Sequence, residues 1–285
     1  MCADEGTGSA GRVRPPIPRW LRVFLLVNVA QDFAIGFSGL VSPRNIVIPL
    51  KGLSPLNARF IAGLYLGGGV IILIVALVHW AVDARIALYC LSVITILVLA
   101  MTFVYWHAFT VDGIPWLWLI TYIADPIVAP VALVTLGVLG AAEPGRHPLT
   151  ALFVGQAVVF GGAGIALMIA PDAMLTAWPW GLTRTLARVY AAFFLAFAVG
   201  AALAAGERRV AAFRPFLIGS IALLVATLSA SLVHPARIDG GPTRWIWFGA
   251  HAAGIVILAL ALMASGRDSG WRGSGWRGSL ATPTP

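Results

Sequence analysis

Two acidic residues lie inside long apolar stretches of this 285-residue chain. Asp32 stands in LLVNVAQDFAIGF and Asp125 in WLWLITYIADPIVAP. At about 1.5 Å per helical residue, each would lie near the middle of a bilayer if its stretch spans one. A charged carboxylate there costs at least about 2.5–3.5 kcal/mol, so the residue type predicts proton transfer or cation binding. The alternative is a protonated aspartic acid that hydrogen-bonds a neighbouring helix and only stabilises packing.

Polar or helix-disturbing residues accompany both acids. Asn28 precedes Asp32 by one helical turn and shares its face. Pro126 and Pro130 follow Asp125, and because proline lacks an N–H, each frees a backbone carbonyl that needs another partner or water. The prolines favour a functional role for Asp125 over a structural one, whereas both roles stay open for Asp32.

The elements that must position these acids are membrane helices. Hydrophobic residues make up 60% of the chain and charged residues 11%, with a mean hydropathy of +0.91. A soluble domain of this length could not bury so much apolar surface, so the composition predicts an all-α polytopic membrane protein. Eight apolar stretches are long enough to cross the membrane: 21–41, 59–79, 86–106, 116–139, 149–169, 187–205, 213–233 and 245–264.

The chain repeats itself after about 128 residues. NARFIAGLYL matches LARVYAAFFL, which pairs Arg59 with Arg188, and WHAFTVDGIPWLW matches VHPARIDGGPTRWIW. An even number of spans returns each half to its starting side, so the pattern predicts two parallel four-helix repeats. The expected organisation is a polar tail (1–18), repeat 1 (19–141), repeat 2 (142–265) and a flexible Gly/Ser/Trp/Arg tail (266–285).

The two halves differ in their polar residues. Asp32 aligns with Phe160, Asp125 with Gly254 and Tyr122 with His251. This asymmetry predicts a site in the first half, with Arg59 as the counter-charge; drift in a half that only packs is the alternative. The expected ligand- or proton-binding residues are Asp32, Asp125, Arg59, Asn28, Tyr122 and His251. For His251 a hydrogen-bonded core histidine is the competing interpretation.

A second polar group is expected at the opposite side of the membrane from the chain termini. It would form a net basic outer vestibule for an anionic lipid headgroup or an organic anion, with plain interfacial anchoring as the alternative. Its predicted members are His107, Asp112, Arg188, His234 and Asp239. Both His107 and His234 follow a span at its end, which disfavours a bis-histidine haem. Trp178 and Trp180 are expected in the interfacial aromatic belt.

Positive residues predict the orientation. With a cytoplasmic N-terminus, twelve of the 19 Lys and Arg residues lie inside, which favours both termini in the cytoplasm. Lys51 is the only lysine, a bias we interpret as that of a bacterial genome, and hence as a plasma (inner) membrane protein. The basic balance does not indicate nucleic acid, because the arginines lie at helix ends. The doublet SGWRGSGWRG predicts a tail touching anionic headgroups, or else a partner-docking motif.

The segment NARFIAGLYLGGGVIIL, an arginine opening a small-residue helix, resembles the DoxX-like four-helix membrane proteins. The resemblance would cover residues 20–140 and 148–265 as two fused units. That family is functionally diverse, and some members are associated with quinone-linked redox complexes. The resemblance implies a fold and no catalytic residue.

The sequence therefore predicts a multi-pass membrane protein that handles a small molecule or ion in a transporter-like way. The alternatives are a non-catalytic accessory subunit of a larger membrane complex and a haem- or quinone-linked oxidoreductase. No nucleotide-binding, hydrolase or metalloprotease motif is present, so the sequence leans against an enzyme and predicts no cofactor. The two cysteines, Cys2 and Cys90, form no metal motif. The expected partners are the lipid bilayer, a small-molecule or anionic-lipid ligand, and subunits of a membrane complex.

Overall fold

The computed structural model describes residues 15–46, 48–109, 116–140, 143–239 and 241–268. Within these residues there are helices and turns but no strand, and eight helices are long and apolar enough to cross a membrane. The all-α polytopic class predicted from composition is confirmed. The helices are α1 (Arg19–Val41), α2 (Pro55–Leu77), α3 (Arg85–Val104), α4 (Trp116–Thr135), α5 (Thr150–Ile169), the short α6 (Pro171–Ala177), α7 (Arg184–Ala205), α8 (Val210–Val233) and α9 (Pro242–Asp268).

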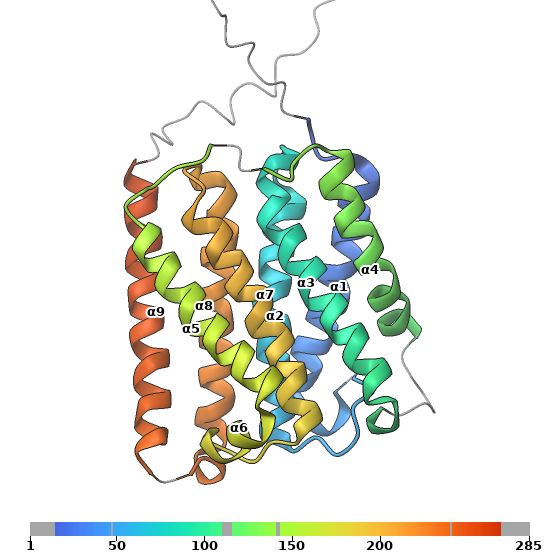
Figure 1. Cartoon of the computed structure of the whole chain (residues 1–285), viewed down its shortest axis with the longest axis vertical. Coiled ribbons are helices and arrows are strands. Elements are labelled where there is room, and N and C mark those ends of the chain that lie inside the picture. The colour runs from blue at the N-terminus through green and yellow to red at the C-terminus, as the bar shows by residue number, and fades with distance from the viewer. Residues whose placement is uncertain (1–14, 47, 110–115, 141–142, 240, 269–285) are drawn as a thin grey trace, which may run out of the picture.

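The eight long helices form two layers of four (Figure 1). One layer runs α5, α7, α3, α4 and the other α9, α8, α2, α1 (Figure 1). Helices α2, α3, α7 and α8 lie at the centre, and α1, α4, α5 and α9 flank them. The start of α1 and the end of α9 share one end of the bundle, which we call the terminal end, and α6 lies at the other, the distal end (Figure 1).

The central contacts join the two halves of the sequence. Helix α2 packs on α8 and α3 packs on α7, whereas α2 and α3 hardly touch each other. Small residues allow this closeness: a Cβ at Gly67 would stand 2.5 Å from Cβ of Leu223, and one at Gly219 would stand 2.7 Å from the carbonyl oxygen of Gly67. Such backbone proximity is the usual route to helix association in lipid, where apolar side chains alone give no preference for a partner helix. The halves are therefore interlocked by their second and third helices.

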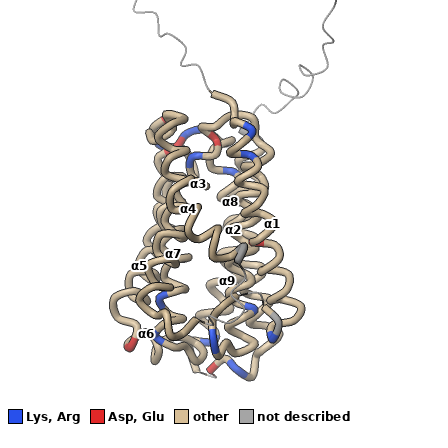
Figure 2. Tube along the Cα trace, turned by 90° about the vertical axis from the view of Figure 1, so that its right-hand side faces the viewer, with Lys and Arg blue, Asp and Glu red and all other residues tan. Residues whose placement is uncertain are grey.

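Charged residues concentrate towards the two ends of the bundle, and the middle is nearly free of them (Figure 2). This distribution agrees with a membrane protein, since hydrocarbon excludes unpaired charge. The predicted boundary between residues 141 and 142 lies outside the described residues, as do most of the two tails. The cytoplasmic placement of the terminal end stays a prediction.

Local capping explains where α2 and α7 begin. Ser54 caps α2 by accepting a hydrogen bond from the backbone N–H of Asn57, and Thr183 caps α7 in the same way from Leu186. Helix α2 starts four residues and helix α7 three residues before the predicted span. Arg59 and Arg188 consequently lie in the second turn of their helices, below the surface of the bundle, and each is only partly exposed.

Candidate functional site

A small polar cavity lies between α1 and α4, against α2, α3 and α7. Its volume is about 50 Å³, enough for a few water molecules and too small for an organic substrate. Four of the six predicted ligand- or proton-binding residues line it: Asn28, Asp32, Tyr122 and Asp125. The two acids, taken from helices about 90 residues apart in sequence, thus share one cavity.

Two hydrogen bonds between α1 and α4 close one wall of this polar cavity. The Nδ2 group of Asn28 donates to Oδ1 of Asp125 at 3.3 Å, and the hydroxyl of Thr121 donates to Oε1 of Gln31 at 2.5 Å. All four side chains are buried, and Asp125 is only 1% exposed. Asn28, Gln31 and Asp32 lie within one turn of α1, so a single helical face presents them together.

A tyrosine pair forms another part of the wall. The hydroxyls of Tyr65 and Tyr122 lie 2.7 Å apart, and Nε1 of Trp118 donates to the Tyr65 hydroxyl at 3.4 Å. Pro126 lies inside α4 and leaves the carbonyl oxygen of Tyr122 without its usual helical donor. Hydroxyls and a freed carbonyl beside two acids are groups that hold water or a small cation.

Asp32 differs from Asp125 in its surroundings. It is partly exposed, packs beside Gly68 and Gly69 of α2, and makes no hydrogen bond to any residue that the structure describes. A carboxyl group without a partner in an apolar span is costly unless water, a proton or a cation satisfies it. Of the two acids, Asp32 is therefore the better placed to bind and release water, a proton or a cation.

Arg59 does not serve these acids as a counter-charge, which corrects the sequence-based expectation. Its Nε donates to the carbonyl oxygen of Leu40 at 3.0 Å, and its Nη1 lies 2.5 Å from Nε2 of His234. The residue stands one turn into α2 at the distal end, away from the lining of the polar cavity. The sequence placed it correctly at a helix end but could not show which way its side chain is held.

His251 lies in a second, larger cavity, between α5 and α9. This lateral cavity has a volume of about 580 Å³, and its lining is almost wholly apolar. It includes Gln156, Phe160, His251 and Gly254, the positions that align by the repeat with Asn28, Asp32, Tyr122 and Asp125. The two cavities thus occupy matching places in the two halves. Of the six predicted residues, four line the polar cavity, His251 lines the lateral cavity, and Arg59 lies at the distal end.

The predicted vestibule residues make contacts across the two halves. Arg188 donates from Nε to the carbonyl oxygen of Met168 at 3.2 Å and from Nη1 to the hydroxyl of Tyr105. The pair of Arg59 and His234 is the counterpart of the pair of Arg188 and Tyr105, because Tyr105 and His234 each cap the third long helix of their half. Burial, together with the charges of Arg59 and Arg237, lowers the pKa of His234 below its ordinary value, so the ring is a neutral acceptor.

The remaining vestibule residues make no hydrogen bond to these pairs within the described residues, although the ring of His107 packs edge-on against that of Tyr105, with centroids 6.4 Å apart. His107 is exposed and offers its backbone carbonyl to Lys51, and Asp239 is exposed with its backbone N–H bonded to Pro179. Asp112 lies outside the described residues. Neither of the two cavities includes any vestibule residue. The vestibule as a ligand site stays a prediction.

Trp178 and Trp180 are buried, which corrects their predicted place in an interfacial belt. They are 7% and 3% exposed and pack with Phe60 and Trp247. Nε1 of Trp180 donates to Oδ1 of Asn57 at 2.7 Å, a contact between the halves. The segment after α6 folds inward because the indole finds a buried amide acceptor there.

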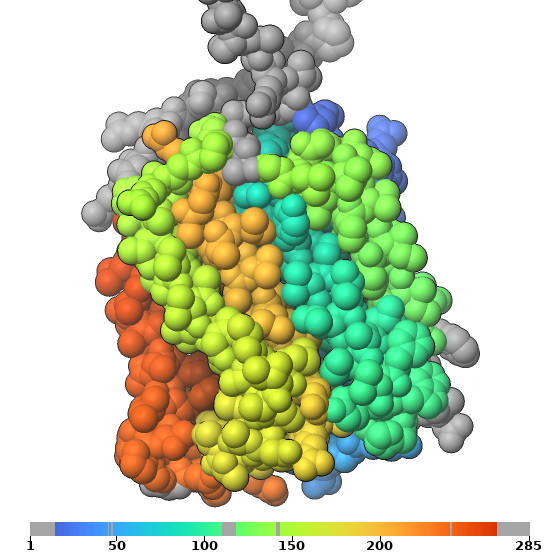
Figure 3. Space-filling model, in the orientation of Figure 1, coloured from blue at the N-terminus to red at the C-terminus, as the bar shows by residue number. Residues whose placement is uncertain are grey.

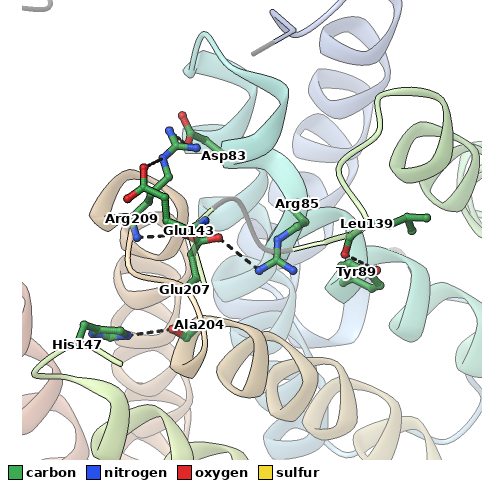
Figure 4. A network of polar contacts seen from close by, with 9 residues as sticks. All are labelled: Asp83, Arg85, Tyr89, Leu139, Glu143, His147, Ala204, Glu207 and Arg209. Carbon is green, nitrogen blue, oxygen red and sulfur yellow. Dashed lines mark hydrogen bonds and ion pairs between the residues drawn. The ribbon is translucent and has the colours of Figure 1, made fainter. Parts of the chain in front are cut away.

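Sequence reasoning missed a network of ion pairs at the terminal end (Figure 4). Arg209 lies 2.7 Å from Asp83, and Arg85 lies 3.6 Å from Glu207. The carboxylate of Glu207 also accepts from the backbone N–H groups of Glu143 and Arg209 at 3.2 Å. Each pair joins an acid of one half to an arginine of the other. The signal was present as DAR at 83–85 and ERR at 207–209, where acid and arginine recur with the same spacing.

No group of three or more metal-binding side chains occurs within the described residues. No protein-family model, curated protein or solved structure matches the chain. The resemblance to DoxX-like proteins accordingly stays a prediction, and the functional assignment depends on the chemistry of the cavities.

Proposed function

We propose that this multi-pass membrane protein takes up and releases a proton or a small cation at Asp32 and Asp125. The observation that carries the proposal is that the two acids line one water-sized cavity within the spanning helices. A volume of about 50 Å³ favours an ion over the organic molecule that the sequence also allowed. The chain would then act in a transporter-like way, as an ion-coupled carrier or a proton relay.

The chemistry follows from placing two carboxyl groups in one small space among the spanning helices. Both cannot ionise there without a large repulsion, so the pair is stable with one proton or with one bound cation. Asn28 holds Asp125 through an N–H donor, which suits the ionised form. Asp32, which has no such donor among the described residues, would carry the exchangeable proton.

The internal repeat predicted from the sequence supports this interpretation. Cross-half pairs recur in matching positions at both ends: Arg85 with Glu207 and Arg209 with Asp83, then Arg59 with His234 and Arg188 with Tyr105. A duplicated frame with one polar cavity is the arrangement expected if one half retained, or acquired, the ion-binding role.

The test is ion flux through purified protein in liposomes that contain a pH-sensitive dye. A potassium diffusion potential drives protons inward, and vesicles that contain a sodium-sensitive dye are then tested with a sodium gradient. We expect flux above that of protein-free liposomes, reduced about tenfold or more in Asp32→Asn and Asp125→Asn. Asparagine keeps the side-chain shape, so elution as a single species and an unchanged unfolding midpoint show that the variants are folded.

Asp172→Asn is the matched control, since Asp172 is 64% exposed in a surface pair with Arg184 and lies far from the cavity in sequence and structure. Its flux should equal that of the unmodified protein. Proton and sodium fluxes no greater than those of empty liposomes, or equal fluxes in all three variants, would overturn the proposal and leave the acids as packing residues.

A further inference from the structure

The lateral cavity lies between two helices, α5 and α9, that face each other without touching closely, and residues of α2, α7 and α8 also line it. From α5 the lining residues follow one helical face, from Ala151 and Gly155 to Val159 and Ala163, and α9 presents a similar face from Thr243 to Leu258. The space-filling view shows the surface hollowed between α5 and α9 (Figure 3). A volume of about 580 Å³ lies in the range of pockets that hold small organic ligands.

His251 is a polar residue in this apolar lining, and the hydrogen-bonding role of each of its ring nitrogens can be assigned. Nδ1 of His251 lies 2.9 Å from the carbonyl oxygen of Trp247, and a carbonyl only accepts, so Nδ1 carries the hydrogen. The neutral ring then presents Nε2 as an acceptor, for which the described residues supply no donor. His251 is 8% exposed, and a buried acceptor without a donor destabilises the protein.

Two residues that line the cavity also hold a fully buried polar atom without a partner among the described residues. These are Nε1 of Trp178 and Oε1 of Gln156. Trp178 is 7% exposed and packs against Trp247, whose ring centroid lies 4.2 Å from that of His251. Both of these atoms are shielded from the cavity, so Nε2 of His251 is the polar atom available to orient a ligand in this apolar space.

We propose that the lateral cavity binds a neutral lipophilic alcohol or phenol, whose hydroxyl donates to Nε2 of His251. The hydrocarbon body lies along α5 and α9, and the aromatic side chains of Phe60, Trp178 and Trp247 surround the polar head. A charged ligand does not fit, because no Lys, Arg, Asp or Glu lines the cavity. The inference is independent of ion binding at the polar cavity.

An ordinary phospholipid does not meet the same need. His251 lies nine residues into α9, about 13 Å below its distal start. At that depth a phospholipid offers only acyl chain, since its polar atoms remain at the interface. A molecule whose hydroxyl enters the hydrocarbon layer supplies the missing donor.

Photolabelling tests this assignment on the full-length protein in liposomes, without any ion gradient. The probe is hexadecanol carrying a diazirine, and its methyl ether is the matched probe without a donor. Labelled peptides are identified by mass spectrometry. We expect saturable labelling of α5 and α9 by the alcohol, about tenfold stronger than by the ether, because the ether leaves Nε2 unsatisfied. His251→Phe should reduce labelling by the alcohol to the level of the ether.

Two glycine variants provide the steric test. A Cβ at Gly155 meets nothing within 4 Å, so Gly155→Phe should fill the cavity without strain and abolish labelling by both probes. Gly162 is equally open on the same helix but does not line the cavity, and Gly162→Phe should label like the unmodified protein. This pair keeps the test decisive even if His251→Phe does not fold.

Equal labelling by alcohol and ether would overturn the proposal. So would labelling by a diazirine-bearing phosphatidylcholine that excess hexadecanol does not displace, because the cavity would then hold an ordinary lipid chain. Unchanged labelling of Gly155→Phe would place the bound alcohol elsewhere and have the same consequence. Because no flux is measured, these outcomes are distinct from failure of the ion-binding proposal.

Discussion

The polar cavity and the lateral cavity occupy matching positions in the two halves and differ in how their flanking helices meet. In the first half α1 and α4 are joined by Asn28 to Asp125 and by Gln31 to Thr121. In the second half the matching helices α5 and α9 have apolar residues at most of these positions, and a space of about 580 Å³ stays open between them. Buried polar bridges thus join one pair of helices around a water-sized space, while apolar faces leave a larger space between the other pair.

The ion-pair network at the terminal end is expected to be the part of the protein whose substitution lowers stability most. Glu207→Ala should destabilise the fold by about 3–5 kcal/mol, because Arg85 is 3% exposed and would be left buried without its acid. Chemical unfolding in mild detergent measures the change. Glu143→Ala is the control in the same network, since Glu143 is half exposed and lies 3.9 Å from Arg209, and should cost under about 1 kcal/mol. Equal effects of the two variants would contradict this account.

The helix bridges can be compared directly by one pair of substitutions. Asn28→Leu should cost about 1–3 kcal/mol, because it removes the N–H donor of the buried Asp125. Gln156→Leu, at the matching position, loses one hydrogen bond to Ser220 but also removes a buried oxygen without a partner, so it should change stability by under about 1 kcal/mol. The unfolding free energies of the two variants are the readout. A cost for Gln156→Leu as large as that for Asn28→Leu would mean that the halves do not differ in this respect.

The pair of Arg59 and His234 at the distal end predicts a modest dependence of stability on pH. The folded protein binds the His234 proton more weakly than the unfolded chain does, so stability contributed by this residue is complete above about pH 6.5 and is lost as pH falls towards the lowered pKa. Because the ring is partly solvated, we expect a loss of under about 1 kcal/mol. His234→Tyr installs the residue that caps the equivalent helix of the first half, Tyr105, and should remove this component. Unfolding midpoints at about pH 7.5 and pH 5.5 give the comparison; an unchanged pH dependence in the variant would rule out His234 as its source.

The smallest effect is expected at the surface pair of Arg184 and Asp172, which are 67% and 64% exposed. Asp172→Asn should leave the stability essentially unchanged and both cavities intact, because solvent screens the pair. The unfolding midpoint checks this, and a substantial loss would show that the distal segment around α6 supports the lateral cavity more than its solvent exposure indicates.

Much of the frame could be predicted because its signals are local in sequence. The length of each apolar stretch determines that eight helices span the membrane, and the positions of Asp32 and Asp125 within their stretches place both acids at similar depth. The repeat also pointed to the matching positions that line the two cavities. Gln31 and Tyr65 were not anticipated, since a single polar residue on a mostly apolar helix gives no indication of the face it shares with another helix.

Tertiary structure alone decided which helices meet. The sequence did not indicate that α2 packs on α8, or that Arg59 bonds His234 and leaves the acids without a counter-charge. The physical reason is that lipid is as apolar as the helix faces, so hydrophobicity inserts a helix but does not orient it. Rotation and partner choice depend on close backbone approach at residues such as Gly67 and on buried polar pairs such as Arg209 with Asp83, and these become apparent only when the helices are assembled.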